Sequence, residues 1–190
     1  MESLVIYVLY ILSLLSFVLY LMIALMILRV YKLYPDEVWV RLSLGFLLLA
    51  SSQIMILITL FITEANIYYA MYTTVPALAV SGSYMIWSAR RITMINIFSS
   101  AVAQLTSVIL YLFPSSLDLI ASVFLAATGL SARGYIRVGF VTIALAHILR
   151  SIWFILSPID YAVYIILLAE MIRSVGAIIM TLIYTRRVVY

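Results

Sequence analysis

Long apolar stretches separated by short polar segments are the dominant pattern of this chain, and there are seven such stretches. None alternates polar with apolar residues, as the strands of a membrane barrel do. A helix satisfies its own backbone in lipid, and about 20 residues at roughly 1.5 Å each cross the hydrocarbon core. We therefore expect one all-α integral membrane domain over residues 1–190, a seven-transmembrane-helix bundle with helices at residues 4–29, 42–62, 68–89, 94–113, 117–133, 138–157 and 161–185.

The first stretch is expected to be a transmembrane helix rather than a cleaved signal peptide. A signal peptide has a basic start, an apolar core of roughly 7–15 residues and a small-residue cleavage site. Here the start carries Glu2, the apolar run extends from Leu4 to Ile27, and no A-x-A pattern follows.

Charged residues alternate between successive gaps and so predict the orientation of the chain. The odd gaps and the C-terminal end hold basic residues, namely Arg29, Lys32, Arg41, Arg90, Arg91, Arg133, Arg137, Arg186 and Arg187. The even gaps hold Glu64, Asp118 and Asp160. By the positive-inside rule, the N-terminus lies outside and the C-terminus lies in the cytoplasm of a multi-pass protein of the cell membrane. The basic residues would then contact anionic lipid.

Composition agrees with a bilayer as the solvent of the chain. Hydrophobic residues make up 67%, charged residues 9%, and the mean hydropathy is +1.26, whereas a soluble domain carries about 25% charged residues. The net charge of +4 follows mainly from the topology signal, so we expect lipid contacts and no direct nucleic-acid binding. No cysteine is present, which excludes disulfides and thiolate metal sites.

The sequence predicts no enzyme, and no catalytic residue, metal or cofactor is expected. The gaps are short and contain neither a P-loop nor G-x-G-x-x-G. His147 is the single histidine and cannot form a bis-histidine haem site or a histidine-based metal centre. An aspartyl intramembrane protease needs two buried aspartates, whereas all the aspartates here are expected in gaps.

Three outward-running helices carry a polar side chain at a similar depth. Gln53, Gln104 and His147 each lie ten or eleven residues before the outer end of a predicted helix. At about 1.5 Å per residue, each is roughly 15 Å below the outer surface, near the bilayer midplane.

Ionisable residues on the last two helices lie at this same depth. Arg150 follows His147 by three residues, and Arg173 follows Glu170 by three, which places each pair on one helix face. We expect Glu170 to pair with Arg150 or His147, with Arg173 completing a net positive cluster. The predicted midplane polar network is Gln53, Gln104, His147, Arg150, Glu170 and Arg173.

The sequence also suggests a weak internal repeat, three tandem hairpins after a lone first helix, although the positive-inside charge pattern alone would produce the basic and acidic ends of each unit. Each unit would run from a basic residue through a midplane polar residue to an acidic one. The three series are Arg41, Gln53 and Glu64; Arg91, Gln104 and Asp118; and Arg137, His147 and Asp160.

Two functions of different class follow from these features. The first is a non-catalytic structural or conduit-forming subunit, bound to other membrane subunits or to copies of itself, with the network locking helix register. The alternative is a small gradient-driven transporter or channel with the network as its site, for an anion or for protons. A closed dry network or an outward-facing stripe favours the subunit, and a wet interior site favours the transporter.

Overall fold

The computed structural model describes residues 2–59, 61, 65–89, 114–156 and 162–189. These residues form an all-helical bundle without strands, and five of its helices are long and apolar enough to cross a membrane. The helices are α1 (Glu2–Leu33), α2 (Glu37–Thr59), α3 (Ala65–Ser88), α5 (Pro114–Ser131), α6 (Tyr135–Leu156) and α7 (Ala162–Val189).

The expected all-α class and the six helices within the described ranges are confirmed. The predicted helix at residues 94–113 lies outside the described residues, as do Arg90, Arg91 and Gln104. All the described helices except α7 begin before the predicted stretches, and α2 begins at Glu37 rather than at Leu42. Its start is stabilised by Asp36, whose Oδ1 accepts the Val38 N–H at 3.0 Å. Glu37 and Arg41, one turn apart, form an ion pair on the same helix.

The turn between α5 and α6 depends on one glycine and one arginine. Gly134 has a φ of 61°, a left-handed conformation that a side chain disfavours. Arg137 returns to the end of α5, where its Nε donates to the Ala132 carbonyl at 3.2 Å and its Nη2 to the Leu130 carbonyl at 3.3 Å. These bonds satisfy carbonyl groups that the end of a helix leaves without partners.

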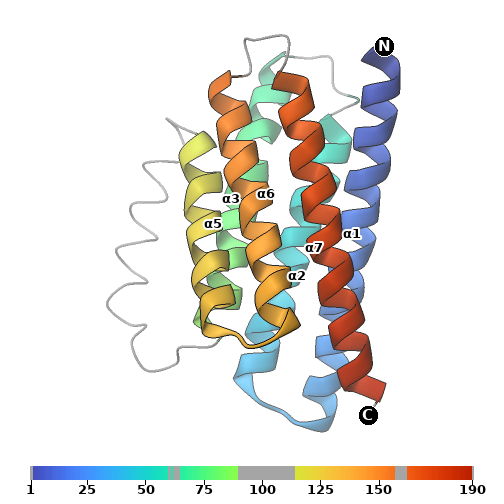
Figure 1. The fold of residues 1–190 in the computed structure, drawn as a ribbon, viewed down its shortest axis with the longest axis vertical. Coiled ribbons are helices and arrows are strands. Elements are labelled where there is room, and N and C mark those ends of the chain that lie inside the picture. Colours follow the sequence, from blue (N-terminus) through green and yellow to red (C-terminus); the bar gives the residue numbers. More distant parts are fainter. Residues whose placement is uncertain (1, 60, 62–64, 90–113, 157–161, 190) are drawn as a thin grey trace.

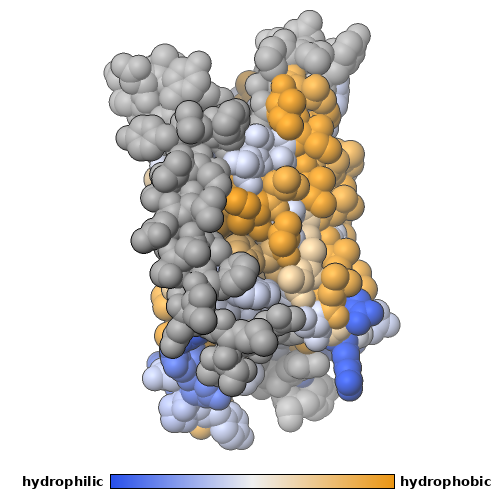
Figure 2. Space-filling model, turned by 90° about the vertical axis from the view of Figure 1, so that its left-hand side faces the viewer, coloured by the Kyte–Doolittle hydropathy of each residue, from blue (hydrophilic) through white to orange (hydrophobic). Residues whose placement is uncertain are grey.

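The six described helices close into a ring (Figure 1). Helix α1 packs against α2, α2 against α3, α3 against α5, α5 against α6, α6 against α7, and α7 returns to α1. The apolar core lies inside this ring, and large apolar side chains cover much of its outer surface (Figure 2). An interior core with an apolar exterior is the arrangement that lipid favours.

Two pairs of glycines reveal an internal relation between the first three and the last three described helices. Gly45 and Gly82 meet where α2 crosses α3, and a Cβ added at Gly82 would lie 2.7 Å from the Gly45 carbonyl oxygen. Gly139 and Gly176 lie in the same way between α6 and α7. Each of the later glycines follows its counterpart by 94 residues (139 − 45 and 176 − 82).

The buried positions obey the same relation. Leu42, Phe46, Leu49, Ala50 and Gln53 of α2 are buried, and so are Ile136, Phe140, Ile143, Ala144 and His147 of α6. The helix contacts agree as well, because α1, α2 and α3 meet in the same order as α5, α6 and α7. The described helices therefore form two similar halves of three, α1–α3 and α5–α7, which run in the same direction.

This arrangement differs from the expected three tandem hairpins. Gln53 and His147, the midplane residues of the first and third predicted units, are equivalent positions, whereas Arg41 and Arg137 lie 96 residues apart and are not. The second unit falls largely on residues outside the described ranges, and its Asp118 lies inside α5 rather than at a helix end in an outer gap. The halves also include α1, which the hairpin scheme left alone, and α5 begins the second half instead of completing the second hairpin.

Phe46 and Phe140 mark the axis that relates the two halves. They are equivalent positions, and their rings stack with centroids 6.3 Å apart. Two equivalent residues touch one another only near the axis of a two-fold arrangement. Tyr20 and Tyr184 flank Phe46, each with a centroid distance of 6.2 Å, so aromatic rings fill the centre of the bundle at this level.

The basic residues gather at one end of the bundle, where the α1–α2 and α5–α6 turns and the end of α7 lie (Figures 1 and 2). Arg41 is partly exposed, and the others with described side chains are exposed, namely Arg29, Lys32, Arg133, Arg137 and Arg186. Arg187 lies in the last turn of α7. The expected clustering of these residues on one side is thus observed for those within the described ranges.

The glycine contacts predict an unequal response to alanine. In Gly82→Ala the new Cβ meets a backbone oxygen that cannot move alone, so we expect a loss of about 1–3 kcal/mol, typical of overpacking. In the matched control Gly139→Ala, the Cβ meets the end of the flexible Met180 side chain, with Sδ at 2.6 Å. Thermal unfolding in detergent should show a lower midpoint for Gly82→Ala than for Gly139→Ala. Equal midpoints would contradict the close α2–α3 contact.

Candidate functional site

Five ionisable side chains lie inside the ring, and none is more than 2% exposed. We refer to them together as the charge cluster. Its members are Asp118 of α5, His147 and Arg150 of α6, and Glu170 and Arg173 of α7. Ionisable groups within an apolar bundle are costly, at about 2.5–3.5 kcal/mol each on the mildest insertion scale. Their burial therefore depends on the partners that the neighbouring helices provide.

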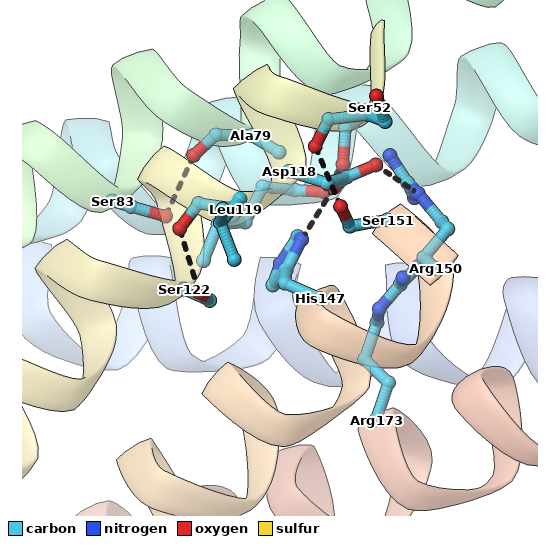
Figure 3. A network of polar contacts seen from close by, with 12 residues as sticks. Ser52, Ala79, Ser83, Asp118, Leu119, Ser122, His147, Arg150, Ser151 and Arg173 are labelled. Atoms are coloured by element: carbon cyan, nitrogen blue, oxygen red, sulfur yellow. Dashed lines mark hydrogen bonds and ion pairs between the residues drawn. The ribbon is translucent and has the colours of Figure 1, made fainter. Parts of the chain in front are cut away.

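Asp118 joins α5 to α6 through both of its carboxylate oxygens. Oδ1 lies 2.7 Å from His147 Nδ1, and Oδ2 accepts the Arg150 Nε–H at 2.8 Å (Figure 3). The two α6 residues are one turn apart, so one carboxylate reaches both. This carboxylate compensates Arg150 and orients the imidazole ring.

The position of Asp118 corrects the sequence analysis, which placed it in an outer gap. Helix α5 begins at Pro114, and Ser151 of α6 donates to the Ser115 carbonyl at 2.8 Å. The first turn of α5 therefore lies level with Ser151, about one and a half turns before the outer end of α6, rather than beyond that end. Asp118 lies on the same buried face as Ala121 and Leu125, a helical spacing that could have indicated its burial.

Arg173 forms the second part of the charge cluster, between α7 and α2. Its Nη1 donates to Glu170 Oε2 and to Gln53 Oε1, each at 3.0 Å. Glu170 thus pairs with Arg173 of its own helix, and the expected pairing with Arg150 or His147 is wrong. The physical reason is that Asp118, which the prediction left outside the network, already binds Arg150 and His147.

Hydroxyl groups extend the polar interior toward α1. Ser16 and Ser174 are hydrogen-bonded through their Oγ atoms at 3.1 Å. Ser174 also donates to the Glu170 carbonyl at 2.9 Å. Tyr20 is fully buried. The charges of Arg173, Glu170 and Arg150 lie close enough to act on its hydroxyl group. Sequence reasoning missed Tyr20, because a tyrosine in an apolar helix resembles any other core aromatic.

Several buried polar atoms of this region have no hydrogen-bond partner among the described residues. They are Arg150 Nη1 and Nη2, Arg173 Nε and Nη2, His147 Nε2, Glu170 Oε1, and the hydroxyl oxygens of Tyr20 and Ser13. Glu170 Oε1 still has the Arg173 Nη1 charge 2.9 Å away. Buried guanidinium N–H groups without acceptors are among the most costly unsatisfied groups in a protein. The charge cluster is therefore suited to an additional acceptor, either water or a solute.

The formal charges of the cluster cancel when His147 is neutral. Arg150 and Arg173 contribute two positive charges, and Asp118 and Glu170 contribute two negative charges. The expected net positive cluster omitted Asp118. A neutral imidazole with Nδ1–H donated to Asp118 presents Nε2 as an acceptor, and a protonated one presents Nε2–H as a donor.

All five ionisable residues come from the second half of the bundle. At the equivalent positions the first half has Gln53 for His147, Ile56 for Arg150, Pro76 for Glu170 and Ala79 for Arg173, each 94 residues earlier. Arg173 binds Gln53 across the boundary between the halves. The site is thus asymmetric within a nearly symmetric scaffold.

Within the described ranges, no three His, Cys, Asp or Glu side chains come together as a metal site. Of the predicted network, the structure brings Gln53, Glu170 and Arg173 into direct contact and places His147 and Arg150 on Asp118. Figure 3 shows Arg173 reaching toward His147 and Arg150 from its own helix. Comparison of the chain with protein-family models, curated proteins and solved structures found no match.

The ion pairs predict different effects for two carboxylates. Asp118→Asn leaves Arg150 buried without a counter-charge, so we expect a loss of about 3–5 kcal/mol, typical of a broken buried pair. The matched control Glu37→Gln breaks the exposed pair with Arg41, and exposed pairs contribute little. Thermal unfolding and the folded fraction in detergent should separate the two. Similar midpoints for both variants would contradict the structural role of Asp118.

Proposed function

We propose that the chain is a small gradient-driven transporter or channel of the cell membrane, with the charge cluster as its solute site. The single observation that carries this proposal is the set of buried guanidinium N–H groups that find no acceptor among the described residues. A lock that only fixes helix register would be expected to satisfy its own donors, because unsatisfied buried groups destabilise the fold. Donors directed into the interior instead favour a hydrated site.

Closure of the ring also supports an interior site. The charge cluster is enclosed by helices of this same chain and does not form a polar stripe on the outer surface. An outward stripe or a closed dry network would favour a subunit, and the donors left without acceptors among the described residues favour a hydrated interior instead. An enclosed site between two similar halves is the usual place for a solute in membrane transporters.

A seven-span topology with the N-terminus outside is part of the proposal. Ser88 and Pro114 lie at opposite ends of the bundle, so the chain between them joins the two ends (Figure 1). A fourth span at residues 94–113 would meet this requirement. The basic end of the bundle would face the cytoplasm by the positive-inside rule.

The cysteine-free sequence allows this topology to be tested directly. Phe61 and Ser131 are exposed residues at opposite ends of the bundle. We expect a membrane-impermeant maleimide to label Phe61→Cys in intact cells and to label Ser131→Cys only after the membrane is opened. The reverse pattern would overturn the orientation.

A structural or conduit-forming subunit is the second candidate function. Helix α1 exposes large apolar residues every three or four positions, as at a helix–helix seam, namely Leu4, Tyr7, Ile11, Leu14, Val18, Met22 and Leu25. Such a row suits either lipid or a partner helix. The partner would be another membrane subunit or a second copy of this chain.

Reconstitution distinguishes the two candidates. The double variant Glu170→Gln/Arg173→Gln removes one ion pair without leaving a lone buried charge, and Ser83→Ala is the matched control for a buried polar site on α3. We expect ion flux through liposomes that contain the chain alone. The double variant should lose most of it while remaining folded, and the control should retain it.

The opposite result favours the subunit. It would consist of no flux from the chain alone, together with stoichiometric membrane partners in material purified gently from native membranes. In that case the double variant should lose those partners, while Ser83→Ala keeps them. If the double variant keeps the wild-type flux, the charge cluster is not the transport site.

A further inference from the structure

The charge cluster has an excess of unpartnered donors over acceptors. Arg150 Nη1 and Nη2 and Arg173 Nε and Nη2 are without partners among the described residues, and a guanidinium group only donates. The acceptors without a hydrogen bond from the described residues are His147 Nε2, in the neutral tautomer set by Asp118, and the hydroxyl oxygens of Tyr20 and Ser13. Glu170 Oε1 is held by Arg173 Nη1 at 2.9 Å. A ligand that completes these contacts must be rich in acceptors.

Charge then restricts the ligand further. The four permanent charges of the cluster cancel, so an anion bound alone would leave one net negative charge in the bundle interior. An unbalanced charge within an apolar interior is strongly disfavoured. A cation would add to the two guanidinium charges, and each carboxylate that could balance it is already paired with an arginine.

His147 provides the missing positive charge. Its Nδ1 is 2.7 Å from Asp118 Oδ1, which leaves Nε2 as the atom that gains a proton. Protonation forms an Nε2–H bond, turns the free acceptor into a donor and adds one positive charge. An anion that arrives with this proton adds one negative charge, so the net charge of the site stays at zero.

We infer that the charge cluster binds one small monovalent anion, of the size of chloride or nitrate, together with one proton on His147 Nε2. The guanidinium groups of Arg150 and Arg173 and the Nε2–H group hold the anion. This inference rests on the proposed function and names the solute of that same site.

The groups that face His147 come from several helices, and each enters the balance. The charged ones are Asp118 of α5, Arg150 of α6 itself and Arg173 of α7. Behind them, Glu170 of α7 and Gln53 of α2 bind Arg173, and Tyr20 of α1 lies near Arg150, Glu170 and Arg173. Asp118 and Glu170 are each paired with an arginine, so proton uptake at Nε2 is the step that changes the net charge of the site.

Anion binding by the purified full chain tests the inference. Chloride would replace gluconate at constant ionic strength, and its apparent Kd would be measured by calorimetry from about pH 5.5 to about pH 8.5, across the ordinary histidine range. Because one proton is taken up with each anion, we expect the Kd to rise by up to about tenfold per pH unit on the alkaline side.

Two variants and one control identify the residues. His147→Gln keeps a side-chain N–H for Asp118 but takes up no proton, so its chloride binding should be weak and independent of pH. Arg173→Lys keeps the charge without the fork of donors, so its affinity should fall while its pH dependence remains. Ser83→Ala, on α3, should bind as the wild type does.

Each contrary outcome has a defined meaning. If chloride and nitrate bind at no pH, water alone completes the donors and the inference is wrong. Binding that is independent of pH in the wild type, or pH-dependent binding that persists in His147→Gln, also overturns it. If proton flux occurs with gluconate as the sole anion, the inferred anion is wrong and the proposed transport stands. If the chain binds the anion but shows no flux, the inferred anion site stands and the proposed transport is wrong.

Discussion

The cost of placing ionised groups among apolar helices is the constraint on which this bundle depends. Each member of the charge cluster is nearly inaccessible, and each carboxylate has an arginine at hydrogen-bonding distance. Asp118 fixes α5 against α6, and Arg173 fixes α7 against α2. Because an unpaired charge would be expelled or neutralised, the pairs determine which helices are neighbours and at what relative height they pack.

Aromatic packing divides the bundle interior into two levels. Phe46 and Phe140 lie seven residues before Gln53 and His147 on their helices, or about 10 Å nearer the basic end. Their stacked rings, with those of Tyr20 and Tyr184, form an aromatic layer at that level. The polar site therefore lies on the far side of this aromatic layer from the basic end.

Sequence reasoning succeeded where the bilayer leaves few choices and failed where helices must be aligned with one another. Apolar length predicted the described helices, since lipid requires satisfied backbones. The depth of Asp118 depends on the height of α5 beside α6, which charge alternation along the chain does not contain. The partner of Glu170 was mistaken for the same reason. The relation between Gly45 and Gly139 became apparent only from the helix crossings they occupy.

The two-fold relation has a consequence for how such a chain could have arisen. Three-helix units that run in the same direction and touch at equivalent phenylalanines are what a fused homodimer would contain. A dimer of identical units carries every axial substitution twice, so Arg173 would be accompanied by a second arginine across the axis. After fusion each copy can diverge alone. Ala79 and Pro76 occupy the positions equivalent to Arg173 and Glu170. The described helices therefore have a single ionised site, and no second arginine across the axis repels Arg173.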